Sequence, residues 1–242
     1  MVKLVATDID GTLTINRIST LMPTEVIEAI HELEKHGVLV ALVSSNALPI
    51  VVGLKKYLGI KGPVVGETGA LVYHGGEVYS ISKYTARDSL EYVLKEFNDF
   101  VRPSWQNVFR VHDFALKVRK QYLSRSGEIY QSIKASVEKR YSFVKVGYSG
   151  YAIHLTPIDV SKGRALDFII EKLGISREEV LAIGDSHMDI DFLQKAGISV
   201  AVSNADKELK DIADIVLTRP SGYGFIELAH MIIHGKIPKT KI

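Results

Sequence analysis

Apolar runs and amphipathic segments alternate along the first part of the chain. Residues 4–7 form an apolar run with β-branched members, which predicts a buried strand. Residues 23–36 place apolar side chains at helical spacing, and residues 38–43 again form a run that predicts a strand. A helix over residues 49–58 and a short strand at 64–65 follow. Strands that alternate with helices predict a parallel α/β sheet.

The last third of the chain repeats this pattern. The apolar spacing predicts helices and strands in alternation, starting with a helix, over residues 161–173, 180–183, 190–196, 198–202, 207–213 and 215–217. We therefore expect both ends of the chain to contribute strands to one Rossmann-like parallel sheet.

The middle of the chain has a different pattern, which begins with a strand near residue 77. Two helices are predicted, over residues 86–100 and 127–140, on either side of a strand segment at 109–119. Two further strands, at 143–148 and 151–156, are joined at Ser149-Gly150, which is a hairpin signal. Strands joined by hairpins indicate an α+β unit inserted into the α/β sheet domain.

This change of pattern predicts two domains. We expect residues 1–79 and 157–242 to form the α/β core domain and residues 80–156 to form an inserted α+β cap domain. Because the insertion leaves and re-enters the core beside polar motifs, we expect it to cover the functional site as a lid. The alternative is a structural elaboration that takes no part in function.

Composition and charge narrow the possible functions. The chain has 242 residues, and its hydrophobic content of 46% with 24% charged residues is typical of a globular protein. Its 30 basic and 28 acidic residues leave a net charge of +2, which argues against a nucleic-acid or membrane partner. The absence of cysteine excludes thiolate chemistry, so any metal would be held by oxygen or imidazole ligands.

The sequence gives no sign of export or membrane insertion. Its longest apolar stretch, residues 38–52, is interrupted by Ser44-Ser45-Asn46 and Pro49, so it is too short to span a bilayer. The chain opens directly into a predicted strand, which argues against a signal peptide. We expect a cytoplasmic protein, a monomer or a homodimer, with residues 235–241 as a solvated end.

Two carboxylates follow the first predicted strand. Asp8 and Asp10 stand in the segment Asp8-Ile9-Asp10-Gly11-Thr12-Leu13, and side chains two residues apart on an extended chain point the same way. Carboxylates held close together repel one another unless a cation neutralises them. The pair therefore predicts a divalent metal site with one nucleophile and one proton carrier. A simple Asp-Gly turn is the alternative.

Further polar side chains follow strands or open helices at the same predicted edge of the sheet. They are Ser44, Lys162, Asp185 and Asp189. Since the carboxyl ends of parallel strands meet at one edge, we expect these side chains to converge with Asp8 and Asp10. Such a set suits phosphoryl transfer, which needs charge neutralisation and positioning more than elaborate covalent chemistry.

Each residue type suggests a role in such a reaction. Asp8 would attack phosphorus as the nucleophile, and Asp10 would protonate the leaving alkoxide and later deprotonate water. Oxygen ligands favour Mg²⁺. The expected ligands are Asp8, Asp10, Asp185 and Asp189. Ser44 and Lys162 would contact phosphoryl oxygens, although taken singly Ser44 could be a turn residue and Lys162 a solvated lysine.

These motifs resemble those of the haloacid dehalogenase superfamily of phosphatases. The resemblance is carried by Asp8-x-Asp10-Gly-Thr-Leu, by Ser44 after a strand, by Val160-Ser161-Lys162-Gly163 and by Gly184-Asp185-x-x-x-Asp189. The long interval after Ser44 leaves room for a cap at the position typical of the Cof-like branch, and the compact chain is most similar to archaeal phosphoglycolate phosphatases. Through a further signature at residues 200–205, the resemblance makes Asn204 a candidate substrate contact.

The chain departs from the family pattern at three positions. Ser45 stands where glycine is usual, Met188 stands where asparagine is usual, and Thr68 replaces the asparagine of a common Glu-Asn-Gly sequence. With Met188 the site would lack one polar contact to phosphate or to a metal-bound water. None of these departures removes an expected carboxylate or Lys162.

The resemblance implies a Mg²⁺-dependent phosphatase that acts through an aspartyl-phosphate on a small phosphorylated metabolite, with 2-phosphoglycolate as the expected substrate. A sugar-phosphate phosphatase, a phosphomutase and a phosphometabolite-binding protein without turnover are the alternatives. A phosphomutase would convert a sugar 1-phosphate to its 6-phosphate, and a binding protein would release no phosphate.

The non-phosphate end of phosphoglycolate is a small carboxylate, which a cap would bind through a fixed donor such as arginine. The basic residues on predicted cap strands are Arg110, His112, Lys117, Arg119 and His154. A solvent-facing sheet surface is the simpler explanation for any one of them, so none is assigned to the site.

Overall fold

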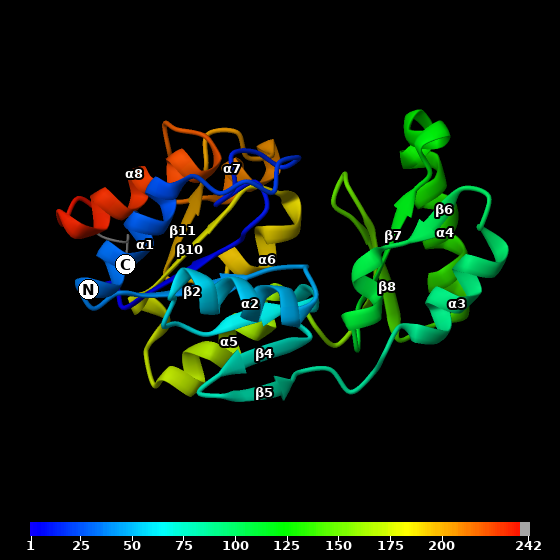
Figure 1. The fold of residues 1–242 in the computed structure, drawn as a ribbon, viewed down its shortest axis with the longest axis horizontal. Coiled ribbons are helices and arrows are strands. Elements are labelled where there is room, and N and C mark those ends of the chain that lie inside the picture. The colour runs from blue at the N-terminus through cyan, green and yellow to red at the C-terminus, as the bar shows by residue number, and fades with distance from the viewer. Residues whose placement is uncertain (238–242) are drawn as a thin grey trace.

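The structure, a computed structural model, describes residues 1–237 and is built on two sheets (Figure 1). Within these residues the larger sheet has eight strands in the order β12-β11-β10-β1-β2-β3-β4-β5. Neighbours from β12 to β3 pair in parallel, and β4 and β5 add an antiparallel edge. The strands are β1 (Leu4–Thr7), β2 (Leu39–Val43), β3 (Val64–Gly66), β4 (Leu71–His74), β5 (Glu77–Ser80), β10 (Val180–Gly184), β11 (Ile198–Ala201) and β12 (Ile215–Val216).

Helices cover both faces of the larger sheet. All four side chains of β1 are buried, and because alternate side chains of a strand point to opposite faces, both faces must be covered. Helix α1 packs against α8, and α5 packs against α6. The helices of this part are α1 (Thr24–Lys35), α2 (Leu48–Leu58), α5 (Lys162–Leu173), α6 (Ile190–Leu193), α7 (Lys207–Ile212) and α8 (Ser221–Ile233).

The smaller sheet is antiparallel and lies to one side of the larger one, in green in Figure 1. Its strands, in the order β6-β7-β9-β8, are β6 (Val101–Pro103), β7 (Phe114–Val118), β8 (Val144–Tyr148) and β9 (Ile153–Pro157). Helices α3 (Arg87–Glu96) and α4 (Ser126–Arg140) cover one face, where Phe114 and Leu116 join an apolar cluster separate from that of the larger sheet. Below, this part is called the cap and the part built on the larger sheet is called the core.

The predicted fold class, a parallel α/β sheet with an inserted α+β unit, is confirmed. The strand expected near residue 77 is β5, which pairs with β4 in the core sheet. The domain boundaries predicted at residues 79/80 and 156/157 stay a prediction.

Two predicted cap elements are shorter than expected. The strand predicted over residues 109–119 is confined to β7, because residues 105–109 form a 3₁₀ helix and Arg110 and Asp113 form a buried ion pair outside the sheet. The helix predicted over residues 86–100 ends at Glu96, and β6 begins soon afterwards.

Two core helices also differ from the prediction. The helix predicted over residues 190–196 ends at Leu193, because the chain turns back so that Gly197 N–H can donate to the carbonyl of Val180. Helix α8 was not predicted, since Gly222 and Gly224 in its first turn lower its intrinsic helix propensity.

Within residues 1–237, none of the helices combines the length and the apolar character needed to cross a bilayer. Of the end that we expect to be solvated, residues 238–241 lie outside the described residues.

Candidate active site

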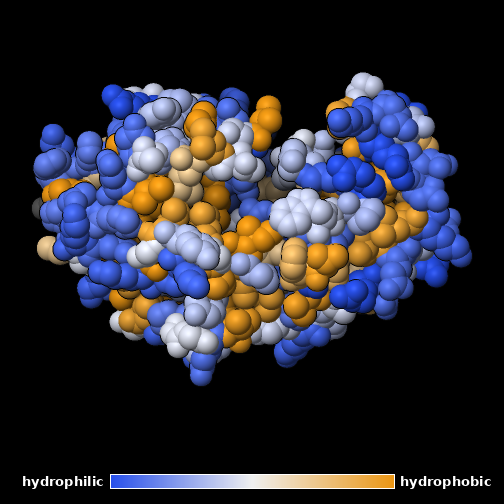
Figure 2. Space-filling model, in the orientation of Figure 1, coloured by the Kyte–Doolittle hydropathy of each residue, from blue (hydrophilic) through white to orange (hydrophobic). Residues whose placement is uncertain are grey.

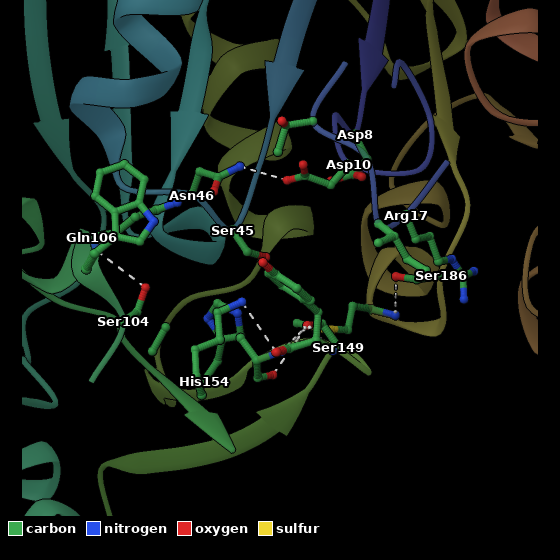
Figure 3. A pocket seen from close by; sticks show the side chains of 18 of the residues that line it. Asp8, Asp10, Arg17, Ser45, Asn46, Ser104, Gln106, Ser149, His154 and Ser186 are labelled. Atoms are coloured by element: carbon green, nitrogen blue, oxygen red, sulfur yellow. Dashed lines mark hydrogen bonds between the residues drawn. The ribbon is translucent and has the colours of Figure 1, made fainter. Parts of the chain in front are cut away.

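A cavity of about 290 Å³ lies where the carboxyl ends of β1, β2 and β10 face the cap. The space-filling view shows the surface hollowed between the two parts (Figure 2). Side chains from both parts line it (Figure 3). Those on the core wall include Asp8, Asp10, Arg17, Lys162 and Asp185, and those on the cap wall include Arg102, Gln106, Arg110, Lys117, Tyr151 and His154.

Asp8 is the first residue after β1, and its carboxylate is almost completely buried. Its Oδ1 accepts a hydrogen bond from Lys162 Nζ at 2.5 Å, and the same ammonium group donates to Asp189 Oδ1 at 2.6 Å. Lys162 is the first residue of α5, whereas Asp8 follows β1 and Asp189 follows β10. Lys162 therefore holds two carboxylates from separate strand ends together.

Asp185 follows β10 and approaches the loop after β1. Its Oδ1 accepts a hydrogen bond from Thr12 Oγ1 at 3.3 Å, and its Oδ2 pairs with the Arg17 guanidinium group. Gly11 has a φ of +94°, and a Cβ atom there would collide with the carboxylate of Asp185 and with Arg17. Glycine in the Asp-x-Asp-Gly segment is therefore what lets the two loops come this close.

Burial and repulsion by neighbouring carboxylates raise the pKa values of Asp8 and Asp185. Burial raises the pKa of Asp8 well above its usual range, and the ion pair with Lys162 offsets only part of this. The charges of Asp189, Asp185 and Asp10 raise it further. Burial and the charge of Asp189 also raise the pKa of Asp185 to about 6, in spite of Arg17.

On Lys162, burial has the opposite effect on the pKa. Burial lowers the pKa of its ammonium group, but the ion pairs with Asp189 and Asp8 outweigh burial and leave the pKa above its usual value. Lys162 is therefore charged at neutral pH, and the carboxylates around it would gain from a further cation.

The carboxylates of Asp8, Asp185 and Asp189 could share such a cation. One oxygen of each lies within 4.8 Å of the others. Asp189 uses Oδ1 with Lys162 and Oδ2 with the backbone N–H groups of Asp185 and Ser186, and Asp185 uses its two oxygens with Thr12 and Arg17. Asp8 uses only Oδ1, with Lys162, among the described residues. Carboxylate oxygens are the ligands that Mg²⁺ prefers, so the residues present fit that ion.

Asp10 is exposed and lies outside this carboxylate cluster. Its Oδ2 accepts a hydrogen bond from Asn46 Nδ2 at 2.8 Å (Figure 3). The same amide donates to Ser44 Oγ at 3.0 Å and accepts a hydrogen bond from Gln106 Nε2 at 2.7 Å. Ser44 itself is buried, and Ser45 and Asn46 line the cavity. A cap residue, Gln106, thus reaches Asp10 through one amide group.

A buried loop after β3 ties the cap to the core. Residues Glu67–Gly69 form a 3₁₀ turn in which Glu67 and Thr68 have positive φ values of 53° and 57°. This strained turn directs the Glu67 carboxylate toward the cap, where it accepts hydrogen bonds from the backbone N–H groups of Val111, His112 and Asp113. The Glu-Thr-Gly signature of the sequence therefore makes a contact between core and cap.

A buried ionic cluster lies on the cap side of this contact. Asp113 is fully buried, and its Oδ1 pairs with Arg110 and with His154 Nδ1. Its Oδ2 accepts hydrogen bonds from Thr156 Oγ1 at 2.5 Å and Thr68 Oγ1 at 3.2 Å. Burial raises the pKa of Asp113, but His154 and Arg110 outweigh burial and leave the pKa below its usual value. Asp113 is therefore ionised and fully partnered.

Of the site residues predicted from the sequence, Ser44, Asp189 and Asn204 do not line the cavity. Ser44 and Asp189 are buried and bond to the lining residues Asn46 and Lys162. Asn204 instead contacts Ser221. Its Oδ1 accepts a hydrogen bond from the N–H of Ser221 at 2.9 Å, and its Nδ2 donates to Ser221 Oγ at 3.0 Å. Ser221 is the first residue of α8, so Asn204 satisfies an N–H group that the helix itself leaves unpaired. This capping role, not substrate binding, is what the geometry supports for Asn204.

The structure also adds residues that the sequence reasoning missed. Arg17 pairs with Asp185, and the available signal was that it is the only basic residue between Asp8 and the first predicted helix. Gln106 gave no comparable signal. Of the five basic cap residues considered from the sequence, Arg110, Lys117 and His154 line the cavity.

Comparison with known proteins identifies the family. A family model described as haloacid dehalogenase-like hydrolase matches residues 5–116 and 106–225. A protein from Staphylothermus marinus named phosphoglycolate phosphatase is 58% identical over 234 residues, which cover 96% of this chain and 98% of that protein. A protein of the same name from Metallosphaera sedula is 40% identical over 233 residues, which cover 96% of this chain and 100% of that protein.

Solved structures share the fold. A crystal structure of a Thermoplasma acidophilum protein has a TM-score of 0.83 and 27% identity, and covers 96% of this chain and 99% of that chain. A haloacid dehalogenase-like hydrolase from Bacteroides thetaiotaomicron has a TM-score of 0.80 and 20% identity, and covers 96% of this chain and 100% of that chain. The chain therefore belongs to the haloacid dehalogenase-like hydrolase family, and the resemblance drawn from its motifs is confirmed.

Proposed function

We propose that this hydrolase is a Mg²⁺-dependent phosphatase that converts 2-phosphoglycolate to glycolate and phosphate through a phosphoryl group held on Asp8. The observation that carries the proposal is the position of the Asp8 carboxylate. It is buried at a strand end between Lys162 and Asp185, and it lines a cavity that Asp10 also lines.

The names of the relatives support the reaction and its substrate. The relatives at 58% and 40% identity are named phosphoglycolate phosphatase, and each alignment covers 96% of this chain. On this basis the chain is a phosphoric monoester hydrolase. The cavity of about 290 Å³ is just below the usual range for small-molecule sites, about 300–1,000 Å³, which suits a small metabolite.

The first chemical step follows from the hydrogen bonds of Asp8. Its Oδ1 is held by Lys162, which leaves Oδ2 to attack phosphorus. As the bond from Asp8 to phosphorus forms, the ester bond between phosphorus and the substrate oxygen breaks. Asp10, held by Asn46, then gives a proton to the leaving alkoxide.

The second step reverses the role of Asp10. A water molecule loses its proton to Asp10 and attacks phosphorus, and the bond between Asp8 and phosphorus breaks to release phosphate. Asp10 lines the cavity, and the proton that it takes from this water replaces the one it gave to the alkoxide, so it is ready for the next turnover. Lys162 remains charged and would stabilise the negative charge on the phosphoryl oxygens, together with the loop from Ser44 to Asn46.

Asp8 and Asp185, with the main-chain carbonyl of Asp10, would hold Mg²⁺, which would neutralise the charge of the phosphoryl group and of the two carboxylates. Asp189 would act through Lys162 and the loop after β10. We include in the proposal a cytoplasmic location and a monomeric or homodimeric state.

The test is phosphate release from a panel containing 2-phosphoglycolate, ethyl phosphate, glucose 6-phosphate and glucose 1-phosphate, with and without Mg²⁺. We expect 2-phosphoglycolate to react fastest, and only with Mg²⁺. Asp8→Asn should lower kcat by about 10³-fold or more, because the nucleophile is lost. Asp88→Asn, an exposed aspartate on α3, is the matched control and should keep normal turnover.

The other possible outcomes would either refute the mechanism or favour one of the alternative functions. Full turnover by Asp8→Asn would refute the mechanism. Faster reaction of the glucose phosphates would indicate a sugar-phosphate phosphatase, and formation of glucose 6-phosphate from the 1-phosphate would indicate a phosphomutase. Binding of these esters without any phosphate release would indicate a binding protein.

A further inference from the structure

The cap wall of the cavity carries more positive charge than its own acid neutralises. Arg102, Arg110 and Lys117 all line it. The neighbouring carboxylate of Asp113 already pairs with Arg110 and His154 and accepts hydrogen bonds from two threonine hydroxyl groups. Within residues 1–237, neither Arg102 nor Lys117 forms an ion pair with a carboxylate. Two cations therefore face the core without a counter-charge of their own.

Strand alternation brings these cations to one face of the cap sheet. On β7, Leu116 points into the apolar cluster under the helices, so Ala115 and Lys117 lie on the opposite face. Arg102 on β6 is the direct cross-strand neighbour of Lys117. Ala115 and Ala152 also line the cavity, and their small side chains leave room for a ligand in front of the cations.

Lys117 is held in a setting that favours an anion. Its Nζ lies over the Tyr151 ring and is 3.4 Å from the Tyr151 carbonyl oxygen. Burial, together with the charges of Arg102 and Arg110, lowers the pKa of Lys117 to about 8, and the charge of Asp10 across the cavity opposes this shift. A bound anion would relieve the repulsion among the three cations.

Arg110 provides a second, independent sign of a ligand. It is only 5% exposed, and its two terminal nitrogens donate to Asp113, to the main-chain carbonyl of Ser45 and to Gln106. Its Nε has no hydrogen-bond partner within residues 1–237. A buried donor without an acceptor is costly, so this arginine in the cavity wall would gain from the negative charge of a bound ligand.

We propose that Lys117 and Arg102, backed by Arg110, bind the carboxylate of the substrate while the core wall binds its phosphoryl group. This inference rests on the proposed function, and it assigns the choice of a carboxylated phosphomonoester to three cap side chains. The core wall supplies carboxylates and Lys162 for one end of the substrate, and the cap wall supplies cations for the other. An ester with a neutral end would leave the cap cations without a counter-charge.

The test compares 2-phosphoglycolate with ethyl phosphate, which has the same length but carries a methyl group in place of the carboxylate. The wild type should prefer 2-phosphoglycolate in kcat/KM by about 10–100-fold, the usual worth of a charge-assisted hydrogen bond. Lys117→Met should remove most of this preference, mainly by raising KM for 2-phosphoglycolate, because the contact is made equally in the ground and transition states. Arg102→Met should act in the same direction but more weakly, since Arg102 is exposed.

Lys139→Met is the matched control, because Lys139 is an exposed lysine of the cap helix α4, and it should leave the preference unchanged. Equal losses on both esters in Lys117→Met, or no change in their ratio, would overturn the inference. So would a wild type that shows no preference. If the wild type releases phosphate from neither ester, the proposed function fails separately. Calorimetric binding of 2-phosphoglycolate then decides the inference: weaker binding by Lys117→Met supports it, and unchanged binding overturns it.

Discussion

The two walls of the cavity are built in different ways. On the core wall, Asp8 and Asp185 follow parallel strands whose carboxyl ends meet, and both are buried within hydrogen-bond reach of fixed partners. On the cap wall, Lys117 and Arg102 stand on the open face of a small antiparallel sheet, and both are at least partly exposed. From this difference we infer that a sheet edge with buried, hydrogen-bonded side chains suits the chemical step, whereas the open face of the inserted sheet suits recognition of the substrate.

We expect the largest effect from a substitution of Lys162, on the core wall. Lys162→Met removes the cation that holds Asp8 and Asp189, and leaves two buried carboxylates without their partner. We expect kcat to fall by about 10²–10³-fold and the free energy of unfolding without Mg²⁺ to fall by about 3–5 kcal/mol. Phosphate release and urea unfolding at neutral pH measure the two effects. A variant with unchanged unfolding would contradict the account of Lys162.

Mg²⁺ should change how stability depends on pH. The pKa of Asp185 is raised from 3.8 to about 6, so between these values the folded state binds more protons than the unfolded chain. Its contribution to the free energy of unfolding therefore falls as pH rises through this window, by on the order of 1–3 kcal/mol. Mg²⁺ should cancel the loss at neutral pH by binding the ionised carboxylates.

Unfolding of the wild type and of Asp185→Asn, each with Mg²⁺ and with a chelator, measures this effect. The difference between the two proteins isolates Asp185 from the other carboxyl groups. A metal-free difference that shifts in favour of the wild type between pH 4 and pH 6 would contradict the raised pKa of Asp185. Equal stabilisation of both proteins by Mg²⁺ would contradict a cation at Asp185.

The cap wall should show its own pH dependence. Lys117, beside Arg102, Arg110 and Tyr151 and facing Asp10, has a pKa of about 8, so its charge is lost as pH rises through that value. We expect kcat/KM for 2-phosphoglycolate to fall about threefold to tenfold between pH 8 and pH 9, because kcat/KM reports the free enzyme. The ratio to ethyl phosphate isolates Lys117, and Lys117→Arg should move the fall to higher pH. A ratio that is constant across this range would contradict the prediction.

We expect the smallest effect from a substitution of Asn204, which we interpret as a structural residue and not as part of the substrate site. Asn204→Ala should lower the free energy of unfolding by about 0.5–2 kcal/mol, because it removes the hydrogen bonds that satisfy the start of α8. Turnover of 2-phosphoglycolate should stay normal, since Asn204 lies away from the cavity. A raised KM without a loss of stability would indicate that Asn204 binds the substrate.

The sequence allowed the core wall to be predicted because simple rules govern it. Apolar runs locate β1 and β10, parallel strands bring their carboxyl ends together, and the residues just after them are Asp8 and Asp185. Lys162 could be placed beside them because it opens a strongly amphipathic helix. The fold class follows from the same alternation of strands and helices.

The remaining features could not be predicted, because they depend on contacts between residues that follow no periodic pattern in the sequence. Arg17 lies in a loop without repeating pattern, so its pairing with Asp185 could not be read from spacing. The alternation around Arg110 suggested a strand, whereas the buried pair with Asp113 takes the chain out of the sheet. Helix α8 begins with glycines of low helix propensity, and Gly222 is required because a Cβ there would collide with the carbonyl oxygen of Leu13.

The central claim, that Asp8 takes the phosphoryl group, is tested most directly by rapid acid quenching of the enzyme during turnover of 2-phosphoglycolate, followed by mass spectrometry of its peptides. We predict a peptide that is heavier by one phosphoryl group, with the modification on Asp8 and absent from Asp8→Asn. A phosphoryl group on any other side chain, or an unmodified Asp8 at every quench time while phosphate is released, would contradict the account.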